Sequence, residues 1–415
     1  MIRRDSIFGA VASWPWFRRV GSLLGALVCL SALAACVATK VPNQPATGQA
    51  PAPAPFQPAP GPAGPQVKVA LLLPLSGGSA SLGESLLEAA QLALFDAPDD
   101  NIALVVRDTG DSPVGASQAA QDAIRDGARL VLGPVFGASV RAVAPVAQAA
   151  GVSVVAFSTD LSVAGPGVYV MGIVPSLQVQ RILGYSGRQG LHRVAALLPQ
   201  SPYGQTVRDA LQGAAQHASI QVVHTDFYDP RAIDASAAVG SLGQYISGGS
   251  AVDAILVPEG GQRLQGIASQ MSSFGVDPTK VRLLGSTLWL GSTPWNGSAI
   301  IGNPALVGSW FAAPALDSWQ RFQQRFRAAY GADPDARASL AYDATLLAAV
   351  LASGSKGPDF SATALTDPAG FSGVDGIFRF KADGTVERGL AIMEVHDGFV
   401  DVRDPAPTSF DQALY

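Results

Sequence analysis

One short segment has the residue types and spacing of a serine nucleophile. Ser353 and Lys356, in the sequence SGSK, match the SxxK pattern in which a lysine lies three residues after a reactive serine. Enzymes with this pattern also carry KTG and SDN motifs, and neither occurs here. The segment follows an expected helix over 339–352, in a glycine-rich turn. We therefore expect Ser353 to have no catalytic role.

Other chemistry is sparse. No HExxH, P-loop or GxSxG motif occurs, and the four histidines have no metal-ligand spacing: His192, His217, His224 and His396. Asp108 and Asp111, in RDTGDSP, suggest a metal at first, but a turn rich in aspartate explains them as well. We predict a protein that is not an enzyme and has neither a cofactor nor a metal.

Polar, glycine-rich loops offer a binding site instead. They follow the expected strands, and the carboxyl ends of parallel strands are where ligands bind in open α/β sheets. For any one residue the alternative is a turn or a helix cap. The candidate cleft residues are Ser76, Gly77, Gly133, Ser139, Ser158, Thr159 and Asp160 in the first half, and Tyr203, Glu259 and Thr287 in the second.

The elements that must position these loops alternate along the chain. Apolar runs such as 67–75, 101–108 and 192–199 predict buried strands, and alanine-rich segments between them predict helices. Ser81 and Glu84 have the spacing of a capping box at the start of a helix that ends at Phe95. The alternating run 376–400 predicts hairpin strands that turn at Asp383 and Gly384. This order predicts an α/β protein with two doubly wound halves.

The N-terminus reads as an export signal that ends at a lipid anchor. Residues 20–35 are uncharged and mostly apolar, basic pairs precede them, and Leu33-Ala34-Ala35-Cys36 resembles a bacterial lipobox. We expect residues 1–35 to be removed and Cys36 to be lipidated; an ordinary signal peptide is the alternative. The only other cysteine, Cys29, lies inside the signal, so we expect no disulfide.

A spacer follows the anchor. Residues 41–66 are nearly all Pro, Ala, Gln and Gly and carry no charge, so we expect 36–66 to be an extended tether of at most about 90 Å over its last 26 residues. Without residues 1–35 the chain has 23 Lys and Arg against 31 Asp and Glu, a net charge of −8. No basic block occurs, which argues against a nucleic acid partner.

The globular sequence resembles a known family. VALLLPLSG, the run VVRDTGDSPVGASQAAQDAIRDGARLVLGPVFG, AGVSVVAFSTD, SPYGQTVRDAL and FSGVDGIFRFKADG are similar to type I periplasmic binding proteins of the leucine/isoleucine/valine-binding group. The resemblance implies two Rossmann-like lobes joined by three crossovers. It places lobe one at 67–178 plus 309–373, lobe two at 179–308 plus 374–405, and a tail at 406–415.

The same resemblance implies roles for the loops. In amino-acid binders of the family, loops that match GPVFGAS and FSTD hold the ligand carboxylate, and a tyrosine that matches Tyr203 closes over the ligand. Their acid for the α-ammonium falls near Thr287 here, which is not an acid, and their first loop often has an aromatic that SGGSASLG lacks. Glu259 is a possible replacement for the acid, and a solvated loop glutamate is the alternative.

Together, the lipobox, the spacer and ALLLPLSG look most like the penicillin-binding protein activators. Our leading hypothesis is therefore a lipid-anchored activator of a peptidoglycan synthase, on the periplasmic face of the outer membrane because Val37 and not aspartate follows Cys36. The alternative is the substrate-binding lipoprotein of an ABC importer for branched-chain amino acids, amides or short peptides, with inner-membrane anchoring. The stretch 287–298, with Trp289 and Trp295, is a candidate partner surface or a loop that covers the core.

Overall fold

The computed structural model describes residues 66–411 except 233, 292–296 and 355–356. The predicted signal, Cys36 and nearly all of the predicted spacer lie outside these residues. Among the described residues, no helix is both long and apolar enough to cross a membrane.

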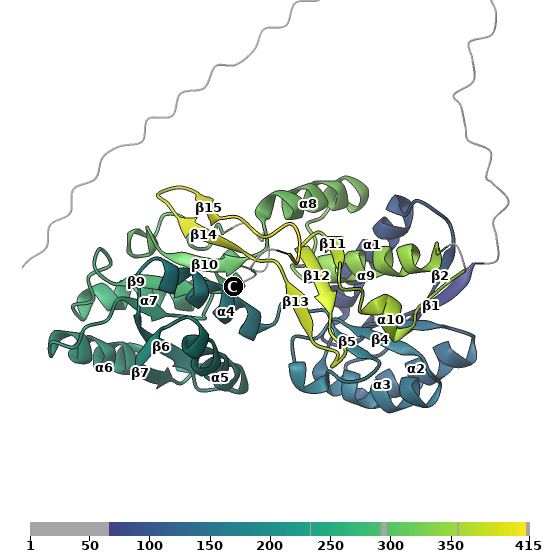
Figure 1. The fold of residues 1–415 in the computed structure, drawn as a ribbon, viewed down its shortest axis with the longest axis horizontal. Coiled ribbons are helices and arrows are strands. Elements are labelled where there is room, and N and C mark those ends of the chain that lie inside the picture. The colour runs from purple at the N-terminus through teal and green to yellow at the C-terminus, as the bar shows by residue number, and fades with distance from the viewer. Residues whose placement is uncertain (1–65, 233, 292–296, 355–356, 412–415) are drawn as a thin grey trace, which may run out of the picture. The chain divides into compact units, whose positions relative to one another are not determined.

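A five-stranded parallel sheet forms the first half of the fold (Figure 1). Its strand order is β2-β1-β3-β4-β5, with β1 at Val67–Leu73, β2 at Ile102–Asp108, β3 at Leu130–Leu132, β4 at Ser153–Ala156 and β5 at Val168–Val170. Residues 69–73 and 130–132 are buried, as expected for strands covered on both faces.

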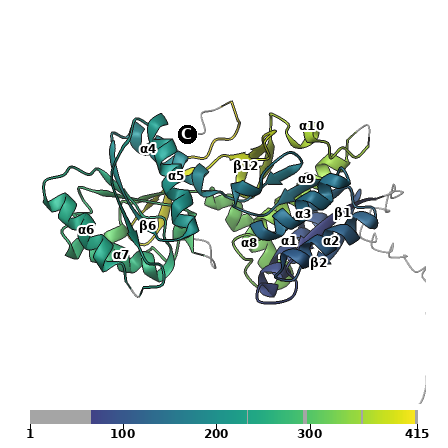
Figure 2. The ribbon, with the colours of Figure 1, turned by 90° about the horizontal axis from the view of Figure 1, so that it is seen from below.

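Helices cover this sheet. They are α1 (Ala80–Asp96), α2 (Pro113–Arg125) and α3 (Gly137–Ala149), and, from much later in the chain, α8 (Leu316–Tyr330), α9 (Ala338–Ala352) and α10 (Ala362–Leu365). Helix α1 packs against α9, and α2 packs against α3, which lies beside it in Figure 2. The predicted capping box is wrong: α1 begins at Ala80, one residue before Ser81, and the residue before the helix, Ser79, makes no side-chain cap.

The second sheet has seven strands in the order β15-β14-β10-β9-β8-β6-β7. These are β6 (Arg193–Pro199), β7 (Gln221–Tyr228), β8 (Ala254–Leu256), β9 (Arg282–Gly285), β10 (Trp310–Ala313), β14 (Ala391–Val395) and β15 (Val400–Asp404). Strands β6 to β10 are parallel, and β14 and β15 are antiparallel to their neighbours.

Residues of one strand serve two cores, because successive side chains point to opposite faces. Val194, Ala196 and Leu198 belong to the core under α4 (Pro175–Arg188) and α5 (Pro202–His217). Ala195 and Leu197 belong to the core that includes α6 (Ser236–Ser247) and α7 (Gly261–Ser273). Figure 2 shows these helix pairs on opposite sides of the sheet.

A small antiparallel sheet completes the fold, with β11 (Phe371–Gly373), β12 (Gly376–Phe380) and β13 (Val386–Arg388). The predicted hairpin turn is confirmed: the Lys381 N–H donates to the Thr385 carbonyl at 2.8 Å, and Gly384 has φ +80°. This sheet packs on the first half, where the Val170 N–H donates to the Gly384 carbonyl at 2.9 Å. Short 3₁₀ turns lie at Leu161–Val163, Thr287–Leu290 and Pro304–Leu306.

The chain crosses between the two halves three times: after β5, after β10 and after β13. This division differs from the predicted lobe boundaries at two places. Residues 310–313 pair with β9 and β14 in the second sheet, whereas the resemblance places 309–373 in lobe one. Residues 376–380 pair with β11 and residues 386–388 pair with β12 in the small sheet beside the first one, whereas the resemblance places 374–405 in lobe two. The fold class itself, two Rossmann-like lobes, is as predicted.

Candidate functional site

A cavity of about 470 Å³ lies where the two halves meet. The first half contributes loop residues after β4 and residues before and within α9, and the second half contributes residues after β6 and β9. Its lining consists of Phe157, Thr159, Ile173, Pro175, Gln178, Tyr203, Thr287, Leu288, Gly291, Asp335, Ala336, Arg337, Leu340 and Asp375. Three of the ten predicted cleft residues are among them: Thr159, Tyr203 and Thr287.

Thr287 is held by a residue that the sequence did not single out. Gln178, buried on α4, accepts hydrogen bonds from the Thr287 N–H at 2.8 Å and from the Thr287 hydroxyl at 3.0 Å. Its amide nitrogen donates to the Ile173 carbonyl at 3.1 Å and to the Val174 carbonyl at 3.4 Å. Gln178 therefore fixes the first crossover to the loop after β9, and Thr287 uses its hydroxyl proton within the protein.

Tyr203 presents a neutral phenol to the cavity. Burial raises the pKa of Tyr203 to about 12, and the nearby Glu259 carboxylate acts in the same direction. The phenol therefore keeps its proton at neutral pH and can donate a hydrogen bond to a ligand. Gly204 follows at the start of α5, where a Cβ would lie 1.8 Å from the Pro199 carbonyl oxygen, so this glycine lets α5 begin close to β6.

Glu259 is engaged away from the cavity. Its carboxylate accepts a hydrogen bond from the Tyr228 hydroxyl and another from the Gly260 N–H at 3.0 Å, and the Arg263 guanidinium, in the first turn of α7, lies 3.7 Å away. Glu259 is not part of the cavity lining. Its contacts are those of a group that organises the loop between β8 and α7.

The loop after β4 is organised by its own polar groups. The Ser158 hydroxyl accepts from the Asp160 N–H at 3.0 Å, and Asp160 pairs with Arg141 at 3.0 Å. Hydrogen bonds from Ser162 and the Arg141 guanidinium hold the pKa of Asp160 below its usual value. Ser139 and Ser158 are buried and do not line the cavity, so Thr159 is the polar residue that this loop presents.

The other predicted residues have backbone roles in the structure. Gly77 has φ +85°, and a Cβ there would lie 2.5 Å from the Asp111 carboxylate. Gly133 has φ +82°, and a Cβ there would lie 2.4 Å from the Leu72 carbonyl oxygen. Neither these glycines nor Ser76 line the cavity.

The two aspartates of RDTGDSP accept hydrogen bonds from backbone N–H groups of nearby loop residues. Asp108 accepts hydrogen bonds from the Leu75 and Gly110 N–H groups at 2.9 and 2.8 Å. Asp111 accepts one from the Ser79 N–H at 3.1 Å. No group of three or more His, Cys, Asp or Glu among the described residues has a geometry that could hold a metal ion.

The charged groups of the cavity come from residues that sequence reasoning missed. Asp335 and Arg337 form a two-pronged ion pair, with nitrogen to oxygen distances of 2.8 and 3.1 Å. Asp375 lies in the turn between β11 and β12 and is fully buried. The sequence VDG around Asp375 reads as a hairpin turn, and only the packing of α9 against this turn brings it to the cavity.

Asp375 belongs to a buried polar cluster. One of its oxygens accepts from the Ser339 hydroxyl at 2.8 Å, and the other, Oδ1, has no hydrogen-bond partner. Asp343, one turn after Ser339 on α9, accepts twice from the Val374 N–H, at 2.8 and 3.1 Å. Arg388 is buried as well and donates to the Met171 carbonyl at 2.7 Å. Burial raises the pKa of both carboxyls, that of Asp343 to about 7.

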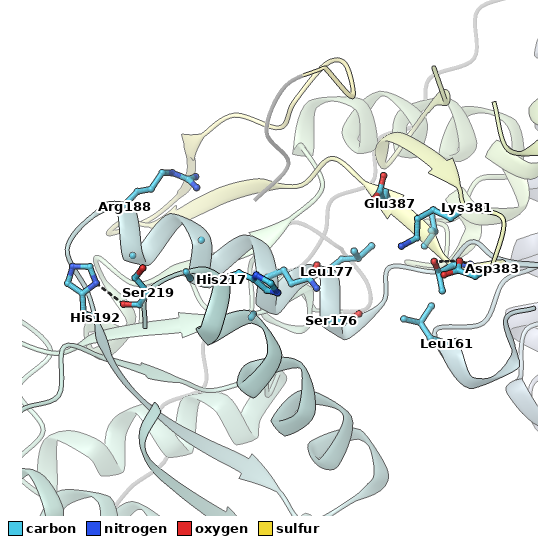
Figure 3. A pocket seen from close by; sticks show the side chains of 17 residues that line it. Leu161, Ser176, Leu177, Arg188, His192, His217, Ser219, Lys381, Asp383 and Glu387 are labelled. Atoms are coloured by element: carbon cyan, nitrogen blue, oxygen red, sulfur yellow. Dashed lines mark hydrogen bonds between the residues drawn. The ribbon is translucent and has the colours of Figure 1, made fainter. Parts of the chain in front are cut away.

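A second cavity, of about 750 Å³, lies between the ends of α4 and α5 and the β12–β13 hairpin (Figure 3). Lys381, Asp383 and Glu387 lie on the hairpin side, and Arg188, His192, His217 and Ser219 lie on the helix side. His192 Nδ1 lies 3.2 Å from the Ser219 carbonyl oxygen. The lining mixes both signs of charge, and none of its residues has a buried polar side-chain atom without a partner. The smaller cavity is the better candidate because the strand ends converge on it.

The remaining sequence candidates have structural contacts. The Ser353 hydroxyl lies 3.0 Å from both the Ala349 carbonyl oxygen and an Asp99 carboxylate oxygen, and Lys356 lies outside the described residues. Trp289 is fully buried and donates to the Val257 carbonyl at 3.0 Å, so its indole covers the core and offers no partner surface. Trp295 lies outside the described residues.

Comparison with known sequences gives one family and one curated relative. A sequence model described as "Periplasmic binding protein" matches residues 66–399. The uncharacterized protein RP748 of Rickettsia prowazekii (strain Madrid E) is 26% identical over 172 residues, which are 41% of this chain and 46% of that protein. The chain thus spans about half the length of this relative.

Solved structures with a similar fold cover most of the chain. A putative branched-chain amino acid ABC transporter protein from Rhodospirillum rubrum is 20% identical with a TM-score of 0.70, over 82% of this chain and 100% of that one. LivJ of Streptococcus pneumoniae, in complex with isoleucine, is 20% identical with a TM-score of 0.57, over 82% and 100%. A solute-binding protein of R. palustris, in complex with benzoate, is 18% identical with a TM-score of 0.58, over 82% and 97%.

Proposed function

Because this chain belongs to the periplasmic binding protein family, we propose that it binds a small organic ligand in the 470 Å³ cavity between its two lobes. The single observation that carries this proposal is the make-up of the cavity. Its wall combines apolar side chains from both lobes with a few polar groups, including Thr159, Tyr203 and Asp375. Sites of this size and composition are typical of small-molecule ligands.

We further propose that the ligand is an amino acid, an amide or a short peptide, and that the protein delivers it to an ABC importer. The isoleucine complex among the similar structures supports this class. The neutral Tyr203 phenol supplies a donor, and Phe157, Leu288 and Leu340 supply apolar surface for a side chain. The family supports a periplasmic location, and the anchor on Cys36 remains a prediction from the sequence.

A thermal-shift and calorimetry screen of the purified protein tests this proposal. The panel contains the standard amino acids, their amides, dipeptides and benzoate. A ligand at one hundred times its Kd stabilises the folded state by about 2.7 kcal/mol. For a fold of roughly 340 residues this raises Tm by about 4 °C. Absence of binding to every member of the panel would contradict the proposal. If a ligand does bind, Tyr203→Phe should bind it more weakly, which would place the ligand in this cavity.

A second candidate is the activator of a peptidoglycan synthase. The observation that favours it is the lipobox at Cys36 with the proline-rich segment that follows, which suits a tethered protein that contacts a partner. Its test is the crosslinking rate of the same bacterium's bifunctional synthase with increasing amounts of this protein. A saturable increase would favour the activator, and no change with any synthase would leave the importer role.

A further inference from the structure

The inference concerns Arg337, and it rests on the proposed binding of a small organic ligand in the 470 Å³ cavity. Arg337 is the one basic residue of the cavity lining within the described ranges. Its side chain is 49% exposed, so a ligand in the cavity can touch it. A guanidinium beside apolar side chains is suited to the recognition of an acid.

Asp335 occupies only one edge of this guanidinium. Arg337 Nε donates to Asp335 Oδ1 at 2.8 Å, and Nη2 donates to Oδ2 at 3.1 Å. A guanidinium has five N–H groups, so three are left. Arg337 Nη1 makes no hydrogen bond to any described residue, and the edge formed by Nη1 and Nη2 can therefore bind a carboxylate through two parallel hydrogen bonds.

Asp335 also holds the guanidinium in place. Its Oδ1 accepts a hydrogen bond from the Arg337 backbone N–H at 2.9 Å. The Asp335 N–H donates to the Ser85 hydroxyl on α1 at 2.9 Å, and its carbonyl accepts from the Ala338 N–H at 2.9 Å. The ion pair is thus anchored to the first lobe, so Arg337 loses little side-chain freedom when a ligand binds.

Three helices begin at the cavity wall. Pro175 is the first residue of α4, Tyr203 is the second residue of α5, and Arg337 directly precedes α9. These helices have 14, 16 and 15 residues. The N-terminal end of a helix carries a partial positive charge. The three helix starts therefore add to the attraction of Arg337 for an anion and disfavour an ammonium group.

The acids around the cavity offer no site for an amine. Both Asp335 oxygens accept from Arg337. The Asp375 side chain has no exposed surface, so a ligand cannot reach it. Asp375 belongs to the buried cluster with Asp343 and Arg388, and burial raises the pKa of both carboxyls, that of Asp343 to about 7. Below this pH one carboxyl is protonated, and Arg388 balances the other.

We propose that Arg337 binds the carboxylate of the ligand and that the cavity selects apolar carboxylic acids whether or not they carry an amine. The carboxylate accepts from Nη1 and Nη2, and the apolar part of the ligand lies against Phe157, Leu288 and Leu340. Amino acids and peptides with a free C-terminus carry this group, and amides do not. The carboxylate site thus lies at the start of α9, apart from the loops GPVFGAS and FSTD.

Four probes related to leucine test the selection by isothermal titration calorimetry on the purified protein at pH 6.5. L-Leucine and 4-methylpentanoate carry the carboxylate, whereas L-leucinamide and isopentylamine carry only the amine. We expect 4-methylpentanoate to bind at least as tightly as L-leucine, and the two amines to bind at least tenfold more weakly than either. Arg337→Gln should weaken 4-methylpentanoate at least tenfold.

Arg327→Gln is the matched control. Arg327, on α8 of the same lobe, pairs with Asp333 through Nε at 2.9 Å and also through Nη2, and its side chain is 59% exposed. It does not line the cavity, so its replacement should change the affinity for 4-methylpentanoate less than threefold.

The outcomes separate the inference from the function on which it rests. Equal binding of L-leucinamide and L-leucine, or wild-type affinity of Arg337→Gln, overturns the carboxylate role and leaves the binding function intact. Binding of L-leucine without binding of 4-methylpentanoate does the same, since the amine would then be required. No binding to any of these probes or to the wider panel overturns the function and the inference together. If Arg337→Gln does not fold, the probe comparison on the wild-type protein decides alone.

Discussion

Replacement of Gln178 by leucine should destabilise the fold measurably, because one buried amide makes four hydrogen bonds. Its oxygen accepts twice from Thr287, and its nitrogen donates to the Ile173 and Val174 carbonyls. Leucine fills a similar volume but leaves all of these groups without a partner. Gln178→Leu therefore tests whether this amide holds the first crossover to the loop after β9.

The magnitude follows from the individual bonds. A typical buried hydrogen bond contributes about 1 kcal/mol, and a stranded N–H such as that of Thr287 costs about 1–3 kcal/mol. The bond to the Val174 carbonyl is long, at 3.4 Å, and adds little. Leucine recovers about 1 kcal/mol through its apolar surface. The expected net loss is about 3 kcal/mol, or about 4 °C in Tm for roughly 340 residues.

Urea unfolding followed by circular dichroism measures this loss, with Gln180→Leu as the matched control. Gln180 lies two residues along the same helix and is partly exposed, so its replacement should change stability by less than about 0.5 kcal/mol. Equal stability of the two variants would refute the reasoning, since the network would then make no net contribution.

Three further predictions concern titration and chemistry. Since the pKa of Tyr203 is raised to about 12, the stability that this phenol contributes is complete below pH 10 and is lost as the pH rises toward 12. The ultraviolet titration curve of the wild type minus that of Tyr203→Phe should show one phenol that ionises near pH 12 and not near pH 10. Burial raises the pKa of Asp343 from 3.8 to about 7, so the stability of the wild type relative to Asp343→Asn should fall as the pH rises from about 4 to 7 in urea unfolding; a constant or rising difference would contradict this. Ser353→Ala should lower the free energy of unfolding by about 1 kcal/mol through its lost hydrogen bonds. The wild type should form no covalent adduct with a fluorescent penicillin. A labelled band in the wild type that disappears in the variant would show that Ser353 is a nucleophile after all.

The fold was predictable because its strands are short, buried and regularly spaced. The run 67–73 is buried from Val69 onward, and a short run rich in valine and leucine is typical of a strand inside a covered sheet. The sheet to which each strand belongs was harder to predict from the sequence. Trp310–Ala313 is a buried apolar run like the others, and only its pairing with β9 and β14 places it in the second sheet.

The cavity residues that the sequence could predict are those that directly follow strands. Thr159, Tyr203 and Thr287 follow strands and reach the cavity for that reason. Gln178 lies in the first helix after a crossover, and Asp375 meets Ser339 across 36 residues of sequence. These contacts depend on how helices pack on turns, which local patterns do not encode. In the sequence Glu259 has the pattern of an available acid, because its partner, Tyr228, comes from the end of β7, 31 residues earlier in the chain.

The pairing of α1 with α9 also sets an order of events during synthesis. The apolar face of α1 is complete at residue 96, but its partner begins at residue 338, about 240 residues later. At about 5–20 residues per second, the ribosome needs roughly 12–50 s to supply that partner. The core of the first lobe therefore cannot be completed while its own strands are being made, because the apolar face of α1 has no α9 to pack against until the last quarter of the chain is available.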